Sequence, residues 1–218
     1  MSGGLDSLCA TAYVKSYKNY EIKIITFSYG QRAKREIVQS KKLAKALNSD
    51  EYRVVDIGFM KQLYGNSNVL TSNKLSIPSK FDYTIVVPIR NAIFITIASA
   101  WAFSVNADFI VFGAHADDYN YPDCRPNFIE SITSALNLGE VDNIRSGTKR
   151  KISIWSPSLE GISKYELLKL GHEILGDTIF ESWSCYYDGK KTHRGLLQCG
   201  ECESCINRKM AFTKAGIE

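Results

Sequence analysis

Short apolar runs rich in β-branched residues alternate along this chain with segments of helical periodicity. The runs predict strands at Ile22–Tyr29, Tyr52–Ile57, Ile85–Val87, Phe109–Phe112 and Ile152–Trp155. The periodic segments predict helices at Leu8–Lys15, Ala33–Leu47, Ala92–Val105, Arg125–Leu138 and from Ser163 to about Leu175. Strands that alternate with helices in this way indicate an α/β fold, with a parallel sheet covered by helices on both faces.

Composition fits one folded core. The chain has 218 residues, of which 44% are hydrophobic and 23% charged. A chain of this length buries roughly 70% of its unfolded surface, so disordered, collagen-like and low-complexity classes are excluded. The formal charge of +4 is mild. It fits an anionic substrate such as a nucleotide, and it is too small to predict stable nucleic-acid binding.

Hydropathy predicts no membrane association. The longest apolar stretch, Ala92 to Val105, is interrupted by Thr96, Ser99 and Ser104, and no signal-peptide pattern opens the chain. We therefore expect a cytoplasmic protein. In a reducing compartment, six cysteines favour metal binding or catalysis over disulfides.

The carboxyl ends of the predicted strands are the expected site of the chemistry, because parallel α/β sheets bind ligands at that edge. These ends lead into four segments: Ser2–Ser7, Ser28–Gln31, Pro88–Asn91 and Gly113–Arg125. Asn91 is expected to cap the helix that follows it. Lys61–Lys80 is polar and lacks periodicity, which predicts a surface loop or lid.

The first of these segments reads Ser2-Gly3-Gly4-Leu5-Asp6-Ser7. Two glycines let the backbone approach a phosphate, and the following helix directs N–H groups and its positive end at the anion. Ser2 and Ser7 add hydroxyl donors, while Asp6 is better suited to hold Mg²⁺. The alternative is a Gly-Gly turn with a Ser or Asp helix cap.

The tail of the chain carries four clustered cysteines, Cys185, Cys199, Cys202 and Cys205. Four thiolates suit tetrahedral Zn²⁺, and two-residue spacers let one turn supply neighbouring ligands. We therefore expect one structural Zn²⁺ per chain. Unrelated cysteines or disulfides are the alternative.

A polar, aromatic loop lies beyond the strand that ends near Gly113. Tyr121-Pro122-Asp123-Cys124-Arg125 offers an aromatic ring, a carboxylate, a thiol and a guanidinium within five residues. Asp117, Asp118 and Tyr119 stand just upstream. A Pro-Asp turn with Asp123 as a helix cap is the simpler interpretation.

The Ser-Gly-Gly-x-Asp-Ser string resembles the loop of the PP-loop ATP pyrophosphatases, which adenylate their substrates. The resemblance narrows to the QueC family of 7-cyano-7-deazaguanine synthases and spans nearly the whole chain. Its further motifs occur in the same order: Phe27-x-Tyr-Gly-Gln31, Val87-Pro-x-Arg-Asn91, Tyr121-Pro-Asp-Cys-Arg-x-x-Phe128, Trp183-Ser-Cys185 and Cys199-Gly-x-Cys-x-x-Cys-x-x-Arg208.

This resemblance implies a nucleotide α-hydrolase domain of the HUP-like, Rossmann-like kind over residues 1–180, with a zinc-binding subdomain over residues 181–218. It also implies a C–N ligase that uses ATP, with Mg²⁺, and ammonia to convert 7-carboxy-7-deazaguanine into 7-cyano-7-deazaguanine, in queuosine or archaeosine biosynthesis. A homodimer is expected on the same ground.

The resemblance also places site residues. The catalytic candidates are Asp6, Ser7 and Arg125. The expected ATP-binding residues are Ser2, Gly3, Gly4, Leu5, Asp6, Ser7, Phe27, Tyr29, Arg90, Asn91 and Gly113. The deazaguanine edge presents adjacent N–H donors that a carboxylate matches, and its carboxylate suits a guanidinium. The expected substrate-binding residues are therefore Asp118, Tyr119, Tyr121, Asp123 and Arg125.

Two features depart from the family pattern. The family's loop follows a central strand, so we expect that residues upstream of Met1 supply that strand. The segment 113–121 lacks the glycine that usually precedes the Tyr-Pro pair.

Three other functions fit parts of the pattern. A PP-loop tRNA thiolase would need a persulfide-carrying cysteine, for which Cys124 is the candidate. A related enzyme could modify a protein with a deazaguanine. A zinc nucleic-acid-binding module would need a stronger basic stripe than the charge provides.

Overall fold

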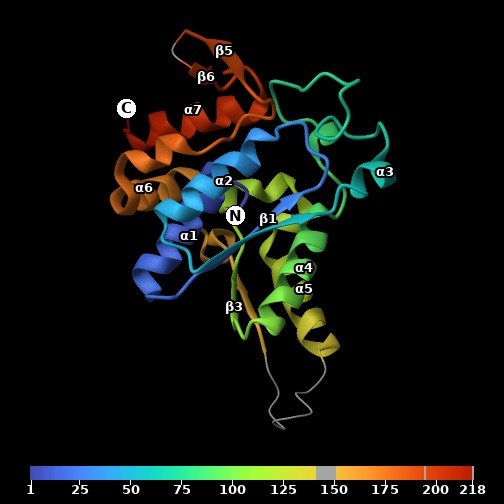
Figure 1. Ribbon diagram of the computed structural model, residues 1–218, viewed down its shortest axis with the longest axis vertical. Coiled ribbons are helices and arrows are strands. Elements are labelled where there is room, and N and C mark those ends of the chain that lie inside the picture. The colour runs from blue at the N-terminus through green and yellow to red at the C-terminus, as the bar shows by residue number, and fades with distance from the viewer. Residues whose placement is uncertain (141–150, 194, 218) are drawn as a thin grey trace. The chain divides into compact units, whose positions relative to one another are not determined.

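The computed structural model describes residues 1–140, 151–193 and 195–217, and it is an α/β structure with parallel strand pairs (Figure 1). The chain forms two compact units, Met1–Pro88 with Lys164–Glu218, and Ile89–Ser163. We call them the first and the second unit. The first is therefore assembled from both ends of the sequence.

The first unit holds the N-terminal strands and the C-terminal helices. Its elements are α1 (Leu5–Lys18), β1 (Lys23–Ser28), α2 (Arg35–Ala46), β2 (Glu51–Asp56), α3 (Met60–Tyr64), η1 (Tyr83–Ile85), α6 (Lys164–Leu175), η5 (Gly176–Glu181), β5 (Lys190–Thr192), β6 (Gly195–Leu197) and α7 (Glu203–Ala215). β1 and β2 pair in parallel, with Lys23 opposite Glu51 and Ser28 opposite Asp56. β5 and β6 form an antiparallel hairpin.

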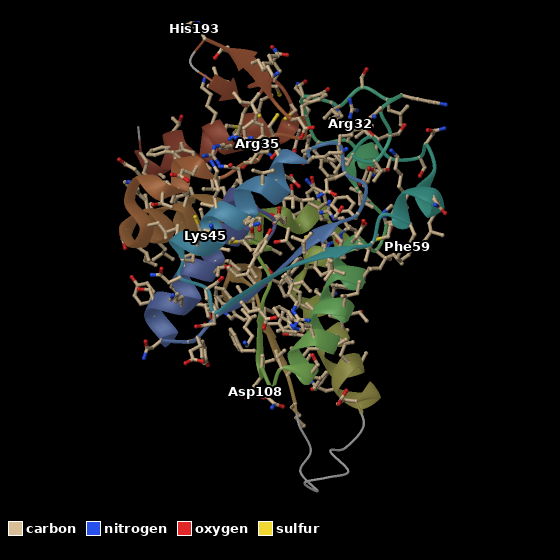
Figure 2. All side chains as sticks on the ribbon, in the orientation of Figure 1. Arg32, Arg35, Lys45, Phe59, Asp108 and His193 are labelled. Atoms are coloured by element: carbon tan, nitrogen blue, oxygen red, sulfur yellow. The ribbon has the colours of Figure 1, made fainter. Side chains whose placement is uncertain are left out.

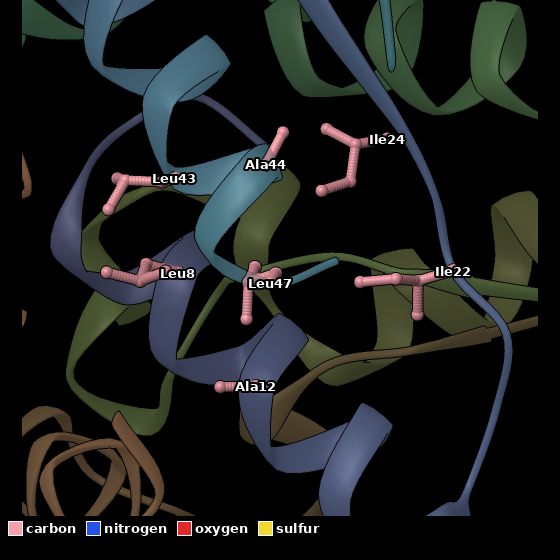
Figure 3. Close-up of a cluster of buried hydrophobic side chains, with 7 residues drawn as sticks. All are labelled: Leu8, Ala12, Ile22, Ile24, Leu43, Ala44 and Leu47. Atoms are coloured by element: carbon pink, nitrogen blue, oxygen red, sulfur yellow. The ribbon is translucent and has the colours of Figure 1, made fainter. Parts of the chain in front are cut away.

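Helices α1 and α2 pack their apolar sides against the start of β1. The buried cluster between them is drawn in Figure 3 and consists of Leu8, Ala12, Ile22, Ile24, Leu43, Ala44 and Leu47. The helical spacing on α2 and the alternation on β1 bring these side chains to one side. This core supports the segment that precedes α1.

Helix α6 lies unusually close to α1. A Cβ atom placed on Gly171 would stand 2.3 Å from the Sγ of Cys9, which is fully buried. Only a glycine allows this approach, so the two helices form one compact pair in the first unit.

The second unit is a smaller α/β layer. Its elements are α4 (Arg90–Ser104), β3 (Phe109–Val111), η2 (Ala116–Asn120), η3 (Pro122–Cys124), α5 (Pro126–Gly139), β4 (Ser153–Trp155) and η4 (Pro157–Glu160). β3 and β4 are parallel, with Ile110 opposite Ile154. Ile95 from α4, Ile129 from α5 and Ile154 form its core.

Most predicted elements are confirmed to within a few residues, but the strand predicted at Ile85–Val87 is wrong. Tyr83–Ile85 instead forms a 3-10 turn, because the carboxylate of Asp82 accepts a hydrogen bond from the backbone N–H of Thr84 at 2.8 Å. Such a side-chain-to-backbone bond competes with strand pairing.

The surface loop predicted at Lys61–Lys80 is only partly correct. Its first residues complete α3, and Asn68–Ser72 is buried. The cause is Arg32, whose guanidinium donates to the carbonyls of Val69, Ser72 and Leu75. The segment therefore wraps around one arginine, a contact that no local pattern reveals.

One helical segment, Tyr83–Ser104, is long and apolar enough to cross a membrane by length and composition, contrary to the expectation above. In the structure, its α4 part buries Asn91, Ile95, Ser99 and Ala102. A helix in the core of a folded protein can be equally long and apolar, so length and hydropathy alone are weak evidence for a membrane span.

The tail after Glu181 packs within the first unit. α6 contacts α7, and the backbone N–H of Glu203 donates to the carbonyl of Pro78. A domain boundary at residue 180 stays a prediction.

Candidate active site and metal centre

The segment Ser2–Ser7, which we call the glycine loop, forms a compact turn directly before α1. The Ser2 and Ser7 hydroxyls lie 3.0 Å apart, and the Ser2 hydroxyl accepts from the backbone N–H of Gly4 at 3.1 Å. Gly4 is the cap residue of α1, whose first residue is Leu5. Two hydroxyls and the amino end of a helix thus converge at one place, as an anion site requires.

Gly3 has a special role in this turn. Its φ of 94° is in the left-handed region, and a Cβ there would stand 2.3 Å from the carbonyl oxygen of Glu36 on α2. No other residue fits both conditions. The glycine loop is therefore held against α2.

Asp6 is in the first turn of α1, and both of its carboxylate oxygens accept from the Lys164 ammonium at 2.6 Å. Lys164 is the first residue of α6, where a cation opposes the helix dipole. Sequence reasoning missed this lysine, although its position at a helix start was a signal that a carboxylate compensates it. The pair gives the glycine loop an anion and a cation side by side.

Phe27 and Tyr29 lie at the carboxyl end of β1, as predicted. The amide of Gln31 closes the turn there, because it accepts from the Tyr29 N–H at 2.9 Å and donates to the Phe27 carbonyl at 3.2 Å. Met1 extends beside this strand, and its backbone nitrogen donates to the Ile25 carbonyl. The glycine loop and the end of β1 therefore belong to one framework.

A cavity of about 640 Å³ opens beside this strand end, within the first unit. Arg32 and Arg35, labelled in Figure 2, lie in the segment that follows β1. The lining residues are Gly30, Gln31, Arg32, Lys34, Lys61, Asn73, Tyr187 and Asp188. Asp188 is already engaged by the backbone N–H of Arg35 at 2.9 Å, so cations dominate the lining. The cavity is suited to an anionic ligand.

In the second unit, Asn91 does not cap α4, which corrects the prediction. Ile89 holds the cap position with a φ of 49°. The Asn91 backbone N–H and side-chain amide each donate to the Asp123 carboxylate at 3.0 Å. Asp123 therefore satisfies the start of α4 from a distant loop, and both of its oxygens are occupied.

The remaining residues of the predicted substrate loop are more exposed. Asp118 accepts from the His115 backbone N–H at 3.1 Å, and the Arg125 Nε donates to the Tyr119 carbonyl at 2.8 Å. The Tyr119 side chain is largely exposed. Asp118, Tyr119, Tyr121 and Arg125 thus lie within one loop of the second unit. Elsewhere in the same unit, Arg90 is the first residue of α4 and Gly113 follows β3.

The four tail cysteines form one cluster. Their Sγ atoms all lie within 4.8 Å of one another, and those of Cys199 and Cys205 are 3.8 Å apart. A tetrahedral zinc with Zn–S bonds of about 2.3 Å requires S–S edges of about 3.8 Å. The donor set and spacing therefore fit a structural zinc with no open position.

Hydrogen bonds connect three of these thiols. Those from Cys185 and Cys205 lower the pKa of Cys202, whereas the hydrogen bond to Cys202 raises the pKa of Cys185. A bound cation would favour the thiolate form of both.

The two other cysteines are inert by comparison. Burial raises the pKa of Cys9 to about 12 and raises the pKa of Cys124 well above its ordinary value. The Asn91 amide also contacts the Cys124 sulfur at 3.3 Å. A neutral, enclosed thiol is a poor nucleophile.

Taken together, these features define an α/β protein with a glycine loop suited to an anion and a four-cysteine cluster that could hold a metal ion. The family profile described as "Queuosine biosynthesis protein QueC" matches residues 1–216. The chain belongs to this family.

Relatives agree with this assignment. A protein of Thermoplasma acidophilum named 7-cyano-7-deazaguanine synthase is 38% identical, over all of this chain and 87% of that protein. Proteins of the same name from Methanococcus maripaludis and Methanocaldococcus jannaschii are each 37% identical, over all of this chain and 94% of theirs.

Proposed function

We propose that the protein is an ATP-dependent 7-cyano-7-deazaguanine synthase, a C–N ligase of queuosine or archaeosine biosynthesis. The observation that carries the proposal is full-length membership of the QueC family together with a glycine loop backed by the Asp6–Lys164 pair. The relatives' names supply the reaction. The substrates are 7-carboxy-7-deazaguanine, ammonia and ATP.

The chemistry explains why ATP is needed. A carboxylate is a poor electrophile because oxide is a poor leaving group. Attack of its oxygen on the α-phosphorus of ATP releases pyrophosphate and gives an acyl adenylate. Ammonia then displaces AMP, loses a proton and forms the amide. Attack of the amide oxygen on a second ATP releases another pyrophosphate and a proton and gives an adenylated imidate. Loss of AMP and a proton from this imidate gives the nitrile.

In this proposal the glycine loop binds the ATP phosphates. The Ser2 and Ser7 hydroxyls and the N-terminus of α1 stabilise the charge that develops on the leaving pyrophosphate. Phe27, Tyr29, Arg90, Asn91 and Gly113 are further residues proposed to bind ATP. When ATP brings Mg²⁺, Asp6 would hold the ion and Lys164 would orient that carboxylate.

The base is proposed to bind at the loop of residues 117–125. Asp118 offers a carboxylate for the ring N–H and the exocyclic amine, Arg125 a guanidinium for the substrate carboxylate, and Tyr119 and Tyr121 aromatic faces. Asp123 is the weakest member of this set, because Asn91 already takes both of its oxygens. Its contribution is to hold the loop.

At the level of the whole chain, we propose a nucleotide α-hydrolase fold with the zinc-binding tail, residues 181–218, as its subdomain. The zinc is structural, one per chain. We further propose that the enzyme works in the cytoplasm as a homodimer and binds neither membranes nor nucleic acid stably.

The decisive experiment is incubation of the zinc-loaded protein with ATP, Mg²⁺, ammonium and 7-carboxy-7-deazaguanine, followed by mass spectrometry. We expect the nitrile together with AMP and pyrophosphate. Omission of ammonium should leave AMP formation possible only as slow hydrolysis of the adenylate. Absence of AMP and of the nitrile would refute the proposal.

A sulfur-transferring PP-loop enzyme would instead depend on Cys124. Burial raises the pKa of this thiol, which disfavours a persulfide role. A Cys124→Ser variant should therefore keep nitrile synthesis. Loss of activity without loss of folding would restore the sulfur-transfer alternative.

A further inference from the structure

The glycine loop is joined to the metal centre by a short segment of the tail. We call this segment, residues 181–185, the strap. Three of its five residues are buried, with Ser182 1%, Trp183 5% and Cys185 0% exposed. The Trp183 backbone N–H donates to the carbonyl of Gly3 at 2.8 Å. At its far end the strap terminates in Cys185, a member of the metal cluster.

Two side chains hold this strap, and the first is Arg208, whose guanidinium donates to the hydroxyls of Ser182 and Ser184 at 2.6 and 3.3 Å. The second, Gln198, bonds the strap's backbone. The Gln198 Oε1 accepts from the backbone N–H groups of Ser184 and Cys185, each at 3.1 Å, and the Gln198 Nε2 donates to the Ser182 carbonyl at 3.0 Å. The amide of Gln198 thus forms hydrogen bonds with the backbone on both sides of Trp183, as a neighbouring strand would. Gln198 stands between β6 and Cys199, so a metal ion held by the cysteine cluster would fix its backbone.

The contact at Gly3 determines how the glycine loop presents its donors. The Gly3 carbonyl and the Gly4 N–H belong to one planar trans peptide and point in opposite directions. When Trp183 holds the carbonyl, the N–H is directed at the Ser2 hydroxyl, which in turn meets the Ser7 hydroxyl. A Gly-Gly peptide flips easily, because neither residue has a Cβ.

We propose that Gln198 is a positioning residue that fixes the Gly3–Gly4 peptide of the glycine loop through Trp183. It touches no substrate. It links the four-cysteine cluster to the glycine loop and so restricts the motion of that loop. In the function proposed above, this is the loop that binds the ATP phosphates. The metal centre is thereby part of the nucleotide site's support as well as of the tail's stability.

The test compares Gln198→Met with Gln198→Glu in the zinc-loaded protein. Methionine keeps the length and removes every hydrogen bond, whereas glutamate keeps the acceptor for Ser184 and Cys185. Gln62→Met, at an exposed glutamine of α3, is the matched control. We measure zinc content, affinity for a fluorescent ATP analogue and hydrogen exchange of the peptide covering residues 1–10.

We expect Gln198→Met to keep zinc, to bind the analogue about fivefold more weakly, the equivalent of one lost neutral hydrogen bond, and to exchange faster in residues 1–10. Gln198→Glu should recover part of both effects, and Gln62→Met should match the wild type. Zinc-loaded Gln198→Met with unchanged affinity and exchange overturns the proposal.

A second measurement covers the case in which Gln198→Met loses zinc. Wild-type protein treated briefly with a chelator should lose protection in residues 1–10 before it does so in α6. Simultaneous loss in both regions, or unchanged protection in residues 1–10, overturns the proposal. If wild-type protein binds no ATP analogue, the proposed function fails, while the exchange result still decides the role of the strap.

Discussion

Asp6 and Lys164 are the residues whose chemistry depends most directly on each other. Asp6→Asn keeps the shape of the side chain but removes the charge, so we expect pyrophosphate release to be lost while the fold persists. Lys164→Met should lower turnover at least tenfold, since the carboxylate of Asp6 loses the ammonium group that it contacts on α6. Stability should fall by about 1 kcal/mol or less in each, because the pair is partly exposed.

A double-mutant cycle measures the interdependence of these two residues. Initial rates of pyrophosphate release and thermal unfolding are recorded for both single variants and for the double variant. Lys169→Met, at an exposed site on the same helix, is the control. Strictly additive losses in rate would contradict a shared function.

Asp123 is expected to matter for stability more than for binding. Asp123→Ala leaves the start of α4 with two unsatisfied donors from Asn91, in a position where the carboxylate is only 8% exposed. We expect a loss of about 2–3 kcal/mol in the free energy of unfolding. Chemical denaturation measures this loss.

Asp118 is expected to matter for binding more than for stability. Asp118→Asn should weaken binding of the deazaguanine about tenfold or more, with little change in the unfolding midpoint.

At the scale of the elements, the local sequence pattern predicts helices and strands with periodic side chains. It misses segments whose conformation depends on distant residues. β1, α2, β3, α5 and α6 follow from spacing and β-branched content. The turn at Tyr83–Ile85 depends on a single carboxylate. The burial of 68–72 depends on Arg32, a contact across more than thirty residues. Such contacts have no periodic signature in the sequence.

The residues of the candidate site also fall into two groups, those that a local sequence pattern reveals and those that depend on distant contacts. The glycine loop and the cysteine cluster are visible in the sequence because their own residues are contiguous or regularly spaced. Lys164 reaches Asp6 only after the chain folds back across 158 residues. Gln198 stands beside Cys199, but its bonds to Ser184 and Cys185 have no periodic signature in the sequence. The role of Asp123 likewise depends on its bond to Asn91, so type and spacing alone place it in a binding loop.

The contact between α1 and α6 gives an element-scale prediction. Gly171→Ala would place a methyl group 2.3 Å from the Cys9 sulfur, so the helices must separate. We expect a loss of about 1–3 kcal/mol from overpacking, measured by thermal unfolding. Adding Cys9→Ala removes the sulfur and should recover part of that loss.

Gly139→Ala serves as its control. A Cβ at that position, the last residue of α5, meets nothing within 4 Å, and alanine favours a helix. If Gly171→Ala were as harmless as this change, the close approach of α1 and α6 would be wrong.

At the scale of the whole molecule, the metal centre is the feature on which the tail depends. Cys202→Ser should abolish the single equivalent of zinc and lower the unfolding midpoint strongly, because structural zinc contributes roughly 10 kcal/mol or more in small modules. Metal analysis and thermal unfolding test this. Cys124→Ser, in the second unit, should keep its zinc. Full zinc occupancy in Cys202→Ser would exclude the four-cysteine site.

The first unit draws on residues 1–88 and 164–218, with the second unit between them. During synthesis the ribosome therefore releases the glycine loop long before Trp183, Lys164 and the cysteines exist to hold it. The second unit can form its own core before residues 164–218, which complete the first unit, have been synthesised. A nascent chain stopped anywhere before Trp183 carries the complete Ser-Gly-Gly-Leu-Asp-Ser string without the hydrogen bond from Trp183 to Gly3. The glycine loop therefore reaches its final form only after residues more than 170 positions downstream have been synthesised.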